Sequence, residues 1–196
     1  MKNALIGASG FAHEVQAYLG VFDIPMFVDE EYWTGKDKNV FKMSDFDPDV
    51  YQVLIALGSS QFRSDISKRM PENTTYFSFI HPLAYFIDSD TDYREGSIFC
   101  PGSMVSINVA FGKQCQLNMN TTIGHGCKMG DFFTTAPGVN ISGDCVIGDR
   151  VYIGTNSAVH QKIHICDDVM IGMGAVVVKD ILKPGTYVGN PARRLE

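Results

Sequence analysis

The 196-residue chain has no apolar run that approaches the ~18 residues a membrane-spanning helix needs. Charged residues are also few, at 19%, and the net charge of −6 excludes the broad basic surface that nucleic acids require. The first residues reach a glycine-containing turn, Gly7-Ala8-Ser9-Gly10, too early for the apolar core of a secretory signal. These absences predict a cytoplasmic protein that binds neither membranes nor nucleic acid.

Cysteine pairing motifs and metal-ligand clusters are also missing. The chain has five Cys residues, an odd number, and none of them lies in a Cys-x-x-Cys motif. This usage fits reduced thiols in a cytosolic compartment. No group of His, Cys and carboxylate residues has the spacing that zinc requires, so we expect no metal. Glycine, by contrast, is frequent, with 19 residues.

Residues 1–80 alternate short apolar runs with segments of helical spacing. Strands are expected at residues 2–6, 25–29, 52–57 and 77–80, and helices at residues 11–19 and 61–70. Strand–turn–helix units in series predict an α/β domain with a small, Rossmann-like parallel sheet and helices on its faces. This length allows at most half of a dinucleotide-binding fold.

From Val105 to Val177 an apolar residue recurs at every sixth position, and only Thr135 departs from the series. The next residue is usually small, which we expect to let the chain turn close to the axis. A period of six is typical of an all-β parallel β-helix, in which three hexapeptides form one coil. Residues 81–196 are therefore the second domain. Looser hexapeptides at Ile87, Tyr93 and Phe99 are expected to add a coil at its entrance.

The repeat also assigns three cysteines to the interior. Cys115, Cys127 and Cys145 occupy the fourth position after an apolar anchor, where a small apolar side chain fits. We expect them to pack in the core and to have no nucleophilic role.

One of the five histidines has a position that suits catalysis. His125 lies between Gly124 and Gly126 at an outward corner, and the residue one coil (18 positions) later is Gly143. An imidazole beside a residue without a side chain leaves space for a reacting group, and histidine accepts a proton near neutral pH. The Gly143 N–H is a candidate donor to a developing oxyanion. The alternative is an exposed corner histidine without a role.

The N-terminal half offers a candidate phosphate site. The turn containing Ser9 and Gly10 follows a strand and opens a helix at Phe11, which directs backbone N–H groups toward an anion. It is not a complete G-x-G-x-x-G motif, so a full dinucleotide site is not expected. Further substrate-binding candidates follow the second and third strands, and these are Asp29, Gly58, Ser59 and Arg63. The alternative is that these glycines only end strands.

Several motifs together resemble one family over essentially the whole chain. They are Gly7-Ala8-Ser9-Gly10-Phe11-Ala12-His13-Glu14-Val15, Ala56-Leu57-Gly58-Ser59-Ser60 with Arg63, Ile80-His81-Pro82, Asn118-Met119-Asn120-Thr121-Thr122-Ile123-Gly124-His125, and Gly189-Asn190-Pro191-Ala192-Arg193. The chain resembles bacterial sugar acyltransferases built from a nucleotide-binding domain and a left-handed β-helix. These are N-acetyltransferases of nucleotide-linked 4-amino sugars, of the bacillosamine and perosamine type, and related sialic acid O-acetyltransferases.

The resemblance implies the parts of an active site. His125 is the expected catalytic base, and acetyl-CoA is expected in the groove between neighbouring β-helices of a homotrimer. Gly143 is expected to offer its amide to the thioester carbonyl, and Asn118 to lie near the sugar amine. The pantetheine and nucleotide path is implied for Thr134, Thr155 and Met173. Lys179 is a candidate for the CoA phosphates, although it also fits a solvated basic tail.

The chain departs from this family at two positions. Members commonly have Glu or Asp directly after the catalytic histidine to orient it, whereas this chain has Gly126. A second histidine often found on the cofactor side corresponds to Thr134. The orientation of His125 must therefore come from elsewhere, for example from the neighbouring chain.

We expect an acetyl-CoA-dependent N-acetyltransferase that acts on the C4 amino group of a UDP-linked 4-amino-4,6-dideoxy sugar and supplies surface polysaccharide or glycoprotein glycans. Three alternatives stay open. An O-acetyltransferase acting on sialic acid would use the same His125 for a harder deprotonation. A metal-dependent hydratase would need several converging histidines, and a non-catalytic carbohydrate-binding solenoid would need no base at all.

Overall fold

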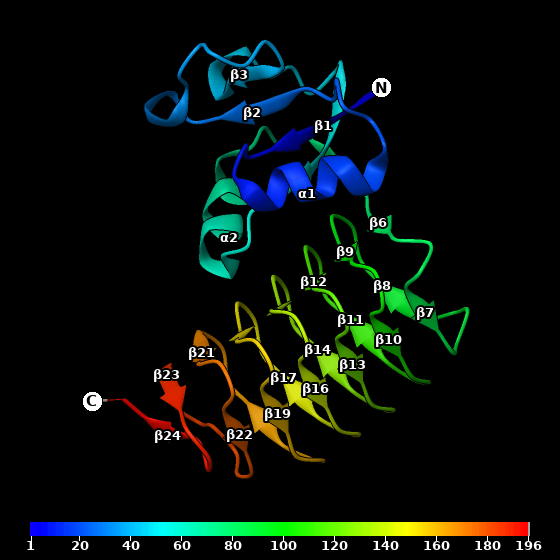
Figure 1. Ribbon diagram of the computed structural model, residues 1–196, viewed down its shortest axis with the longest axis vertical. Helices are drawn as coiled ribbons and strands as arrows, with labels where there is room; N and C mark the ends of the chain where they lie inside the picture. Colours follow the sequence, from blue (N-terminus) through cyan, green and yellow to red (C-terminus); the bar gives the residue numbers. More distant parts are fainter. Residues whose placement is uncertain (196) are drawn as a thin grey trace.

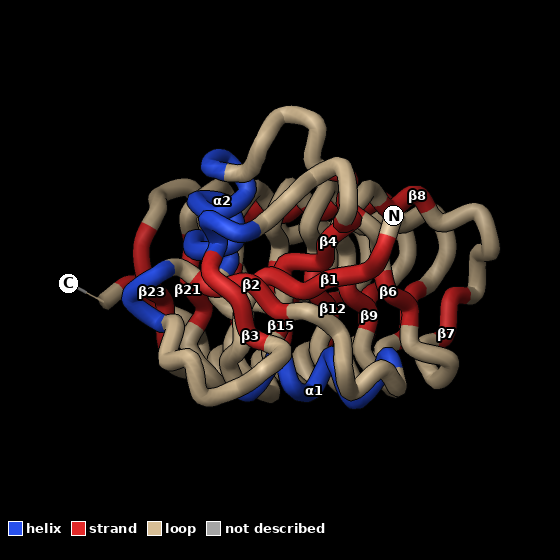
Figure 2. The backbone as a smooth tube through the Cα atoms, turned by 90° about the horizontal axis from the view of Figure 1, so that it is seen from above, coloured by secondary structure: helices blue, strands red, loops and turns tan. Residues whose placement is uncertain are grey.

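The computed structural model describes residues 1–195, which form two parts (Figure 1). The N-terminal part is a sheet with two helices, and the rest is a stack of coils. The sheet lies over the middle of the stack, and the coils extend past it (Figures 1 and 2). No helix within the described residues is long and apolar enough to cross a membrane.

The N-terminal part contains, in chain order, β1 (Lys2–Ile6), α1 (Gly10–Leu19), β2 (Met26–Val28), η1 (Glu30–Tyr32), β3 (Val40–Lys42), η2 (Met43–Asp45), β4 (Tyr51–Ile55), α2 (Ser60–Arg69) and β5 (Thr75–Tyr76). The five strands are parallel, in the order β3-β2-β1-β4-β5. Successive residues of a strand point to opposite faces, so Leu5 packs with Ala12 of α1 and Ile6 packs with Ile66 of α2. The two helices therefore cover opposite faces of the sheet (Figure 2).

The structure corrects one expected strand and adds another. The apolar spacing predicts a strand at residues 77–80 in this sheet, but β5 closes the sheet and β6 (Phe79–Ile80) pairs with the coils. Alternation alone does not identify a strand's partner, so the sequence could not separate the two sheets. The short strand β3 was not among the expected elements.

The coils have three faces, each a ladder of parallel strands. The first face contains β6, β9 (Ile98–Phe99), β12 (Gln116–Leu117), β15 (Thr134–Thr135), β18 (Tyr152–Ile153), β21 (Val169–Ile171) and β23 (Gly185–Val188), with β24 (Arg193–Arg194) antiparallel at its end. The second face contains β7 (Tyr85–Phe86), β10 (Met104–Val105), β13 (Thr122–Ile123), β16 (Asn140–Ile141), β19 (Ala158–Val159) and β22 (Val176–Val177). The third face contains β8 (Asp92–Tyr93), β11 (Ala110–Phe111), β14 (Lys128–Met129), β17 (Val146–Ile147) and β20 (His164–Ile165).

The six-residue period is confirmed as the source of the coil interior. Every anchor from Val105 to Val177 is buried, including the polar exception Thr135. The Thr135 hydroxyl lies 2.8 Å from the Thr121 hydroxyl and also accepts a hydrogen bond from the Asn118 N–H, so its burial leaves no polar group unpaired. The cysteines expected inside, Cys115, Cys127 and Cys145, are 0% exposed.

The turn between faces depends on a different residue from the one expected. The left-handed backbone conformation recurs at every sixth residue from Gly96 to Gly174, three positions after each anchor. The small residue directly after the anchor serves another purpose. A Cβ on Gly124 would lie 2.6 Å from the backbone nitrogen of Gly143, so glycine is needed here because the next coil is close.

Candidate active site

His125 follows β13 at the corner where the second face turns into the third. Its side chain is 63% exposed and lies against Gly143, the equivalent residue of the next coil. A Cβ on Gly143 would be 2.6 Å from the imidazole Cε1 and 2.7 Å from Nε2. The backbone of Gly143 is not in the left-handed region, so its glycine is required for space alone. The expected pairing of His125 with a residue that lacks a side chain is present.

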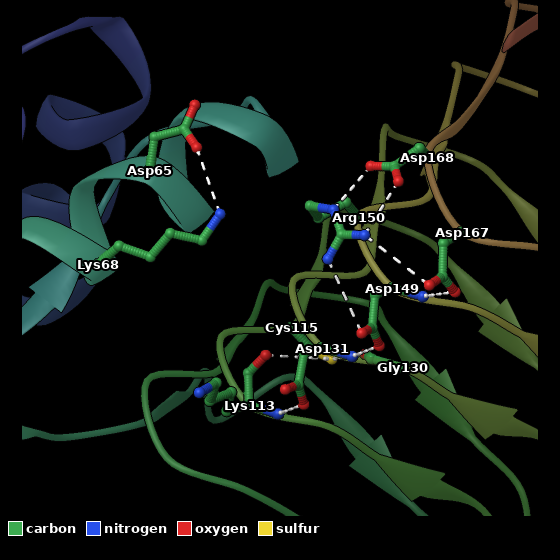
Figure 3. Close-up of polar contacts among 10 residues, drawn as sticks. All are labelled: Asp65, Lys68, Lys113, Cys115, Gly130, Asp131, Asp149, Arg150, Asp167 and Asp168. Carbon is green, nitrogen blue, oxygen red and sulfur yellow. Dashed lines mark hydrogen bonds and ion pairs between the residues drawn. The ribbon is translucent and has the colours of Figure 1, made fainter. Parts of the chain in front are cut away.

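The Gly143 N–H has no hydrogen-bond acceptor among residues 1–195. Corresponding N–H groups at the corner between the third and first faces are occupied. There Lys113 donates to the Asp131 carboxylate at 2.9 Å, and Asp131 donates to Asp149 at 2.8 Å (Figure 3). The corner at His125 therefore offers an amide donor that the fold itself does not use, as an oxyanion requires.

The corner that carries His125 continues along the stack. Gly143, Gln161 and Lys179 follow the later strands of the second face, β16, β19 and β22. Adjacent strands are ~4.8 Å apart, so Lys179 lies about 14 Å from His125, at the same edge. Lys179 is exposed at this edge, on the same side of the stack as His125.

A cleft of about 530 Å³ separates the N-terminal part from the first face. Its walls are Phe11, Gly58, Ser59, Ser60, Gln61, Gln116, Asn118, Thr134, Thr135, Ala136, Arg150, Tyr152, Asp168, Val169 and Met170. Five of the expected site residues lie here together, namely Phe11, Gly58, Ser59, Asn118 and Thr134. Ser9 and Gly10 directly precede Phe11 and are exposed, but they do not line the cleft.

Both N-terminal helices begin beside this cleft. β1 and β4 are adjacent parallel strands, and α1 and α2 start just after their carboxyl ends. Ser59 caps α2 by accepting a hydrogen bond from the Phe62 N–H at 3.3 Å. Ser9, at the start of α1, makes no such side-chain cap. The start of α1 thus carries unpaired backbone donors and a hydroxyl near the cleft, a combination that suits an anion.

Arg63 occupies a different environment from the one expected of a substrate-binding residue. It is 0% exposed, and its guanidinium donates to the carbonyl oxygens of Leu57 at 2.9 Å and Phe132 at 3.0 Å. It also donates to the Gln114 carbonyl at 3.1–3.2 Å and to the Thr134 hydroxyl at 2.6 Å. Burial lowers the pKa of Arg63 to about 9. Arg63 therefore joins α2 to the coils and does not face the cleft.

Two other expected residues also have partners within the chain. The Asp29 carboxylate accepts two hydrogen bonds from Arg69, at 3.2 and 2.8 Å, so a ribose would have to share it. The Thr134 side chain is 3% exposed, and its hydroxyl is held by Arg63. Neither polar group is free in this arrangement.

The cleft also contains a charged cluster that sequence reasoning missed. Arg150 donates to both oxygens of Asp168, at 2.6 and 3.0 Å, with carboxylates of Asp149 and Asp167 each 3.8 Å from the guanidinium (Figure 3). The hydrogen bond from Arg150 lowers the pKa of Asp168. The available signal was the separation of Arg150 and Asp168 by one coil, since this spacing stacks them at the same corner.

The expected site residues thus fall into separate regions of one chain. His125, Gly143 and Lys179 share the corner between the second and third faces. Thr155 and Met173 lie at the corner that follows the first face, and Met173 is 80% exposed. Asn118 begins that same corner and opens onto the cleft. Within residues 1–195, no group of three or more His, Cys, Asp or Glu residues could hold a metal ion.

Comparison with known proteins relates the chain to sugar N-acetyltransferases. No family model matches it. A GDP-perosamine N-acetyltransferase from Escherichia coli O157:H7 is 30% identical over 149 residues, which cover 72% of this chain and 66% of that protein. The chain therefore spans just under two thirds of the length of this curated relative.

Two solved structures match over nearly their full length. WeeI from Acinetobacter baumannii AYE has a TM-score of 0.89 and 28% identity, with all of both chains covered. The acetyltransferase domain of PglB from Neisseria gonorrhoeae FA1090 has a TM-score of 0.86 and 27% identity, with 99% of both chains covered. The same domain has also been solved in complex with acetyl coenzyme A, with a TM-score of 0.82.

These matches confirm the expected family and the expected class of enzyme, an acetyltransferase. The parallel coils fit the left-handed β-helix that the resemblance implies. The chain belongs to the hexapeptide-repeat acyltransferases, among the N-acetyltransferases of the perosamine and bacillosamine type.

Proposed function

We propose that the protein transfers the acetyl group of acetyl-CoA to the C4 amino group of a nucleotide-linked 4-amino-4,6-dideoxy sugar. The observation that carries this proposal is the placement of His125 on Gly143, where a proton acceptor and an unused amide donor meet at an open corner. The N-acetyltransferase activity for which the Escherichia coli relative is named and the acetyl coenzyme A complex of the PglB domain support the same reaction.

The proposed reaction needs no metal. The neutral sugar amine attacks the thioester carbonyl, and the His125 Nε2 accepts the proton that the amine loses. The Gly143 N–H donates to the oxyanion of the tetrahedral intermediate. The intermediate then collapses, the C–S bond breaks, and the CoA thiolate leaves. The Lys179 ammonium would attract the CoA phosphates.

In this proposal residues 1–80 bind the nucleotide and residues 81–196 carry out acetyl transfer. The N-terminal strand order has a topological switch point between β1 and β4, where Rossmann-like sheets bind ligands. The cleft lined by Phe11, Gly58 and Ser59 lies at this point, beside the starts of both helices. These features support a nucleotide site, with Ser9 and Gly10 toward the phosphates.

The separation of the two regions supports a homotrimer with active sites between subunits. The cleft lies against the first face, whereas His125 lies at the opposite corner of the same coil. A sugar bound in the cleft of one copy is therefore best placed to meet His125 of a neighbouring copy. Asn118, Thr155 and Met173 of one copy would then line the groove opposite His125 and Gly143 of the next.

We propose UDP as the nucleotide. We also propose the cytoplasm as the location, because all five cysteines are unpaired within residues 1–195 and free thiols persist in a reducing compartment. The Escherichia coli relative is named for a GDP-linked substrate, so the GDP sugar is the direct competitor. The purified protein should be incubated with acetyl-CoA and, separately, a UDP-linked 4-amino-4,6-dideoxy sugar, GDP-perosamine and sialic acid, while free thiol is measured.

We expect thiol release with the 4-amino sugars, fastest with the UDP-linked one. His125→Ala should lower kcat by about 10²-fold or more, because general base catalysis contributes this much. His164→Ala, which removes an exposed histidine from the third face, should retain wild-type activity. Turnover with sialic acid alone would support the O-acetyltransferase instead, and no turnover with any acceptor would favour a binding module.

Subunit complementation tests the shared site. His125→Ala removes the base. Gly58→Phe is designed to fill the cleft that Gly58 lines, because a Cβ at position 58 would meet no atom within 4 Å. Each variant alone should be inactive, but co-expressed copies should regain activity at interfaces that combine the intact corner with an intact cleft. If mixed oligomers form without regaining activity, the site lies within one chain.

A further inference from the structure

The residue after His125 is a glycine, and a side chain from the next coil occupies the space beside it. Gly126 has a left-handed backbone, and a Cβ on it would lie 2.3 Å from the Oδ1 of Asp144. Asp144 is the residue one coil after Gly126 and follows Gly143 directly. The space that a side chain at position 126 would use is therefore occupied by a carboxylate from position 144.

Asp144 is hydrogen-bonded to the His125 backbone, and its carboxylate accepts no hydrogen bond from the described residues. Its N–H donates to the His125 carbonyl oxygen at 2.7 Å, and its Oδ1 lies 3.6 Å from the His125 Nδ1. No hydrogen bond to this carboxylate is formed within residues 1–195. The aspartates of the neighbouring corner differ, because Asp131, Asp149 and Asp167 each accept a backbone N–H at 2.8–2.9 Å.

The turn itself does not need the negative charge of Asp144. Two turns at another corner have the same arrangement with asparagine. The Asn120 Oδ1 lies over Gly102 and the Asn156 Oδ1 lies over Gly138, at 2.3 and 2.2 Å from the position of the missing Cβ. Asn and Asp both tolerate the left-handed conformation that these turns require. The charge at position 144 is thus free to serve the histidine beside it.

We propose that Asp144 is a positioning residue that orients His125 by accepting a hydrogen bond from its Nδ1–H. This inference rests on the proposed role of His125 as the base. The 3.6 Å separation is too long for a hydrogen bond. We expect the half-exposed Asp144 side chain to rotate when substrate binds, so that Oδ1 comes within ~3 Å of Nδ1. With the proton held on Nδ1, the Nε2 lone pair is available for the substrate amine. The carboxylate that orients the histidine thereby comes from the next coil, into the space left by the missing side chain at position 126.

The decisive variant is Asp144→Asn, which keeps the turn and removes the carboxylate. We expect kcat to fall about 10- to 100-fold, with KM for both substrates within about threefold and an unchanged melting temperature. Asn156→Asp is the reverse exchange at another turn and should leave the melting temperature unchanged. This control shows that exchanging Asn and Asp does not by itself alter the stability of such a turn. A fall in kcat accompanied by a lower melting temperature would overturn the proposal in favour of a structural role, as would wild-type kcat.

A carboxylate exchange provides the rescue. Gly126→Asp combined with Asp144→Gly moves the carboxylate to the position directly after His125 and removes the oxygen that would collide there. Aspartate tolerates a left-handed backbone, as Asp144 itself shows with φ of 60°. The kcat of the double variant should be at least tenfold higher than the kcat of Asp144→Gly alone. Failure to recover any, in a folded double variant, would contradict the proposal.

A spectroscopic readout separates this inference from the proposed function. The imidazole ¹⁵N shifts of His125, assigned with His125→Ala, report which ring nitrogen carries the proton. The wild type should show the Nδ1–H tautomer, and Asp144→Gly, which removes the acceptor altogether, should shift the population toward Nε2–H. Identical shifts in both proteins would refute the role of Asp144. If the wild type acetylates no sugar but the shifts still differ, the proposed function fails and the positioning contact stands.

Discussion

Gly143→Ala is the sharpest test of the active-site geometry because it adds one carbon and removes nothing. The new Cβ would lie 2.6 Å from the His125 Cε1 and 2.7 Å from Nε2. Alanine keeps the backbone N–H of residue 143, and the backbone there is not left-handed. The substitution therefore displaces the imidazole while the proposed oxyanion donor stays in place.

The size of the displacement sets the expected loss. Carbon atoms in contact lie about 3.5–4.0 Å apart, so the ring must move outward by about 1 Å. A misplacement of about 1 Å at a reacting group costs about 10²-fold in rate. We therefore expect kcat for thiol release to fall about 100-fold. The stability should not fall, because Gly→Ala stabilises by about 0.4–1 kcal/mol where the backbone is compatible.

Steady-state kinetics and thermal unfolding of the same preparations provide the measurement. Ser142→Ala, a small change at the adjacent exposed residue, is the matched control and should behave as the wild type. Wild-type kcat in Gly143→Ala would show that the imidazole position does not matter for the reaction. A loss of kcat together with a large loss of stability would mean that residue 143 supports the coil rather than the site.

Two further predictions concern the stability of the fold. Arg63→Met should lower the free energy of unfolding by about 3–5 kcal/mol in urea titrations. The substitution leaves the carbonyls of Leu57 and Gln114 without a donor, and the Phe132 carbonyl keeps only the Thr134 hydroxyl. A loss below about 1 kcal/mol would contradict the joining role. Asp168→Asn should destabilise the fold most at neutral pH. Arg150 lowers the folded-state pKa of Asp168, so the ionised carboxylate stabilises the folded protein above the unfolded pKa near 3.8. This stabilisation is lost as the pH falls further, through the folded-state pKa. The gap in unfolding free energy between wild type and variant should therefore shrink below pH ~4, and a gap that does not change with pH would refute the ion pair.

The β-helix could be predicted because one physical requirement recurs at a fixed interval. Each coil needs an apolar residue on each face, so the anchors from Val105 to Val177 show the six-residue period directly. Even the exception, Thr135, kept the register. The left-handed turn position was missed because it has no single residue type. Glycine occurs there at position 138, but Phe132 and Arg150 adopt the same backbone conformation.

The role of Arg63 could not be predicted, because its partners are backbone atoms. Arg63 lies in the first turn of a helix that follows a parallel strand, where a phosphate-binding residue is expected. The sequence contains no sign of the carbonyls of Gln114 and Phe132. Arg63 reaches those carbonyls only because α2 packs on the corner of the coils. Backbone acceptors carry no residue identity, so a contact of this kind is visible only in three dimensions.

The carboxylate near His125 shows how a coil changes the meaning of sequence distance. In a β-helix with 18 residues per coil, residues 18 apart lie about one strand spacing (~4.8 Å) from each other. A motif read along the chain finds only Gly126 beside His125 and reports that a carboxylate is missing. Read across coils, the same corner contains Asp144, with Oδ1 3.6 Å from the imidazole Nδ1. A glycine at position 126 and an aspartate at position 144 are then one feature, because the first creates the space that the second fills. Substitution at either position should therefore affect the other, and the carboxylate exchange between positions 126 and 144 measures that coupling directly.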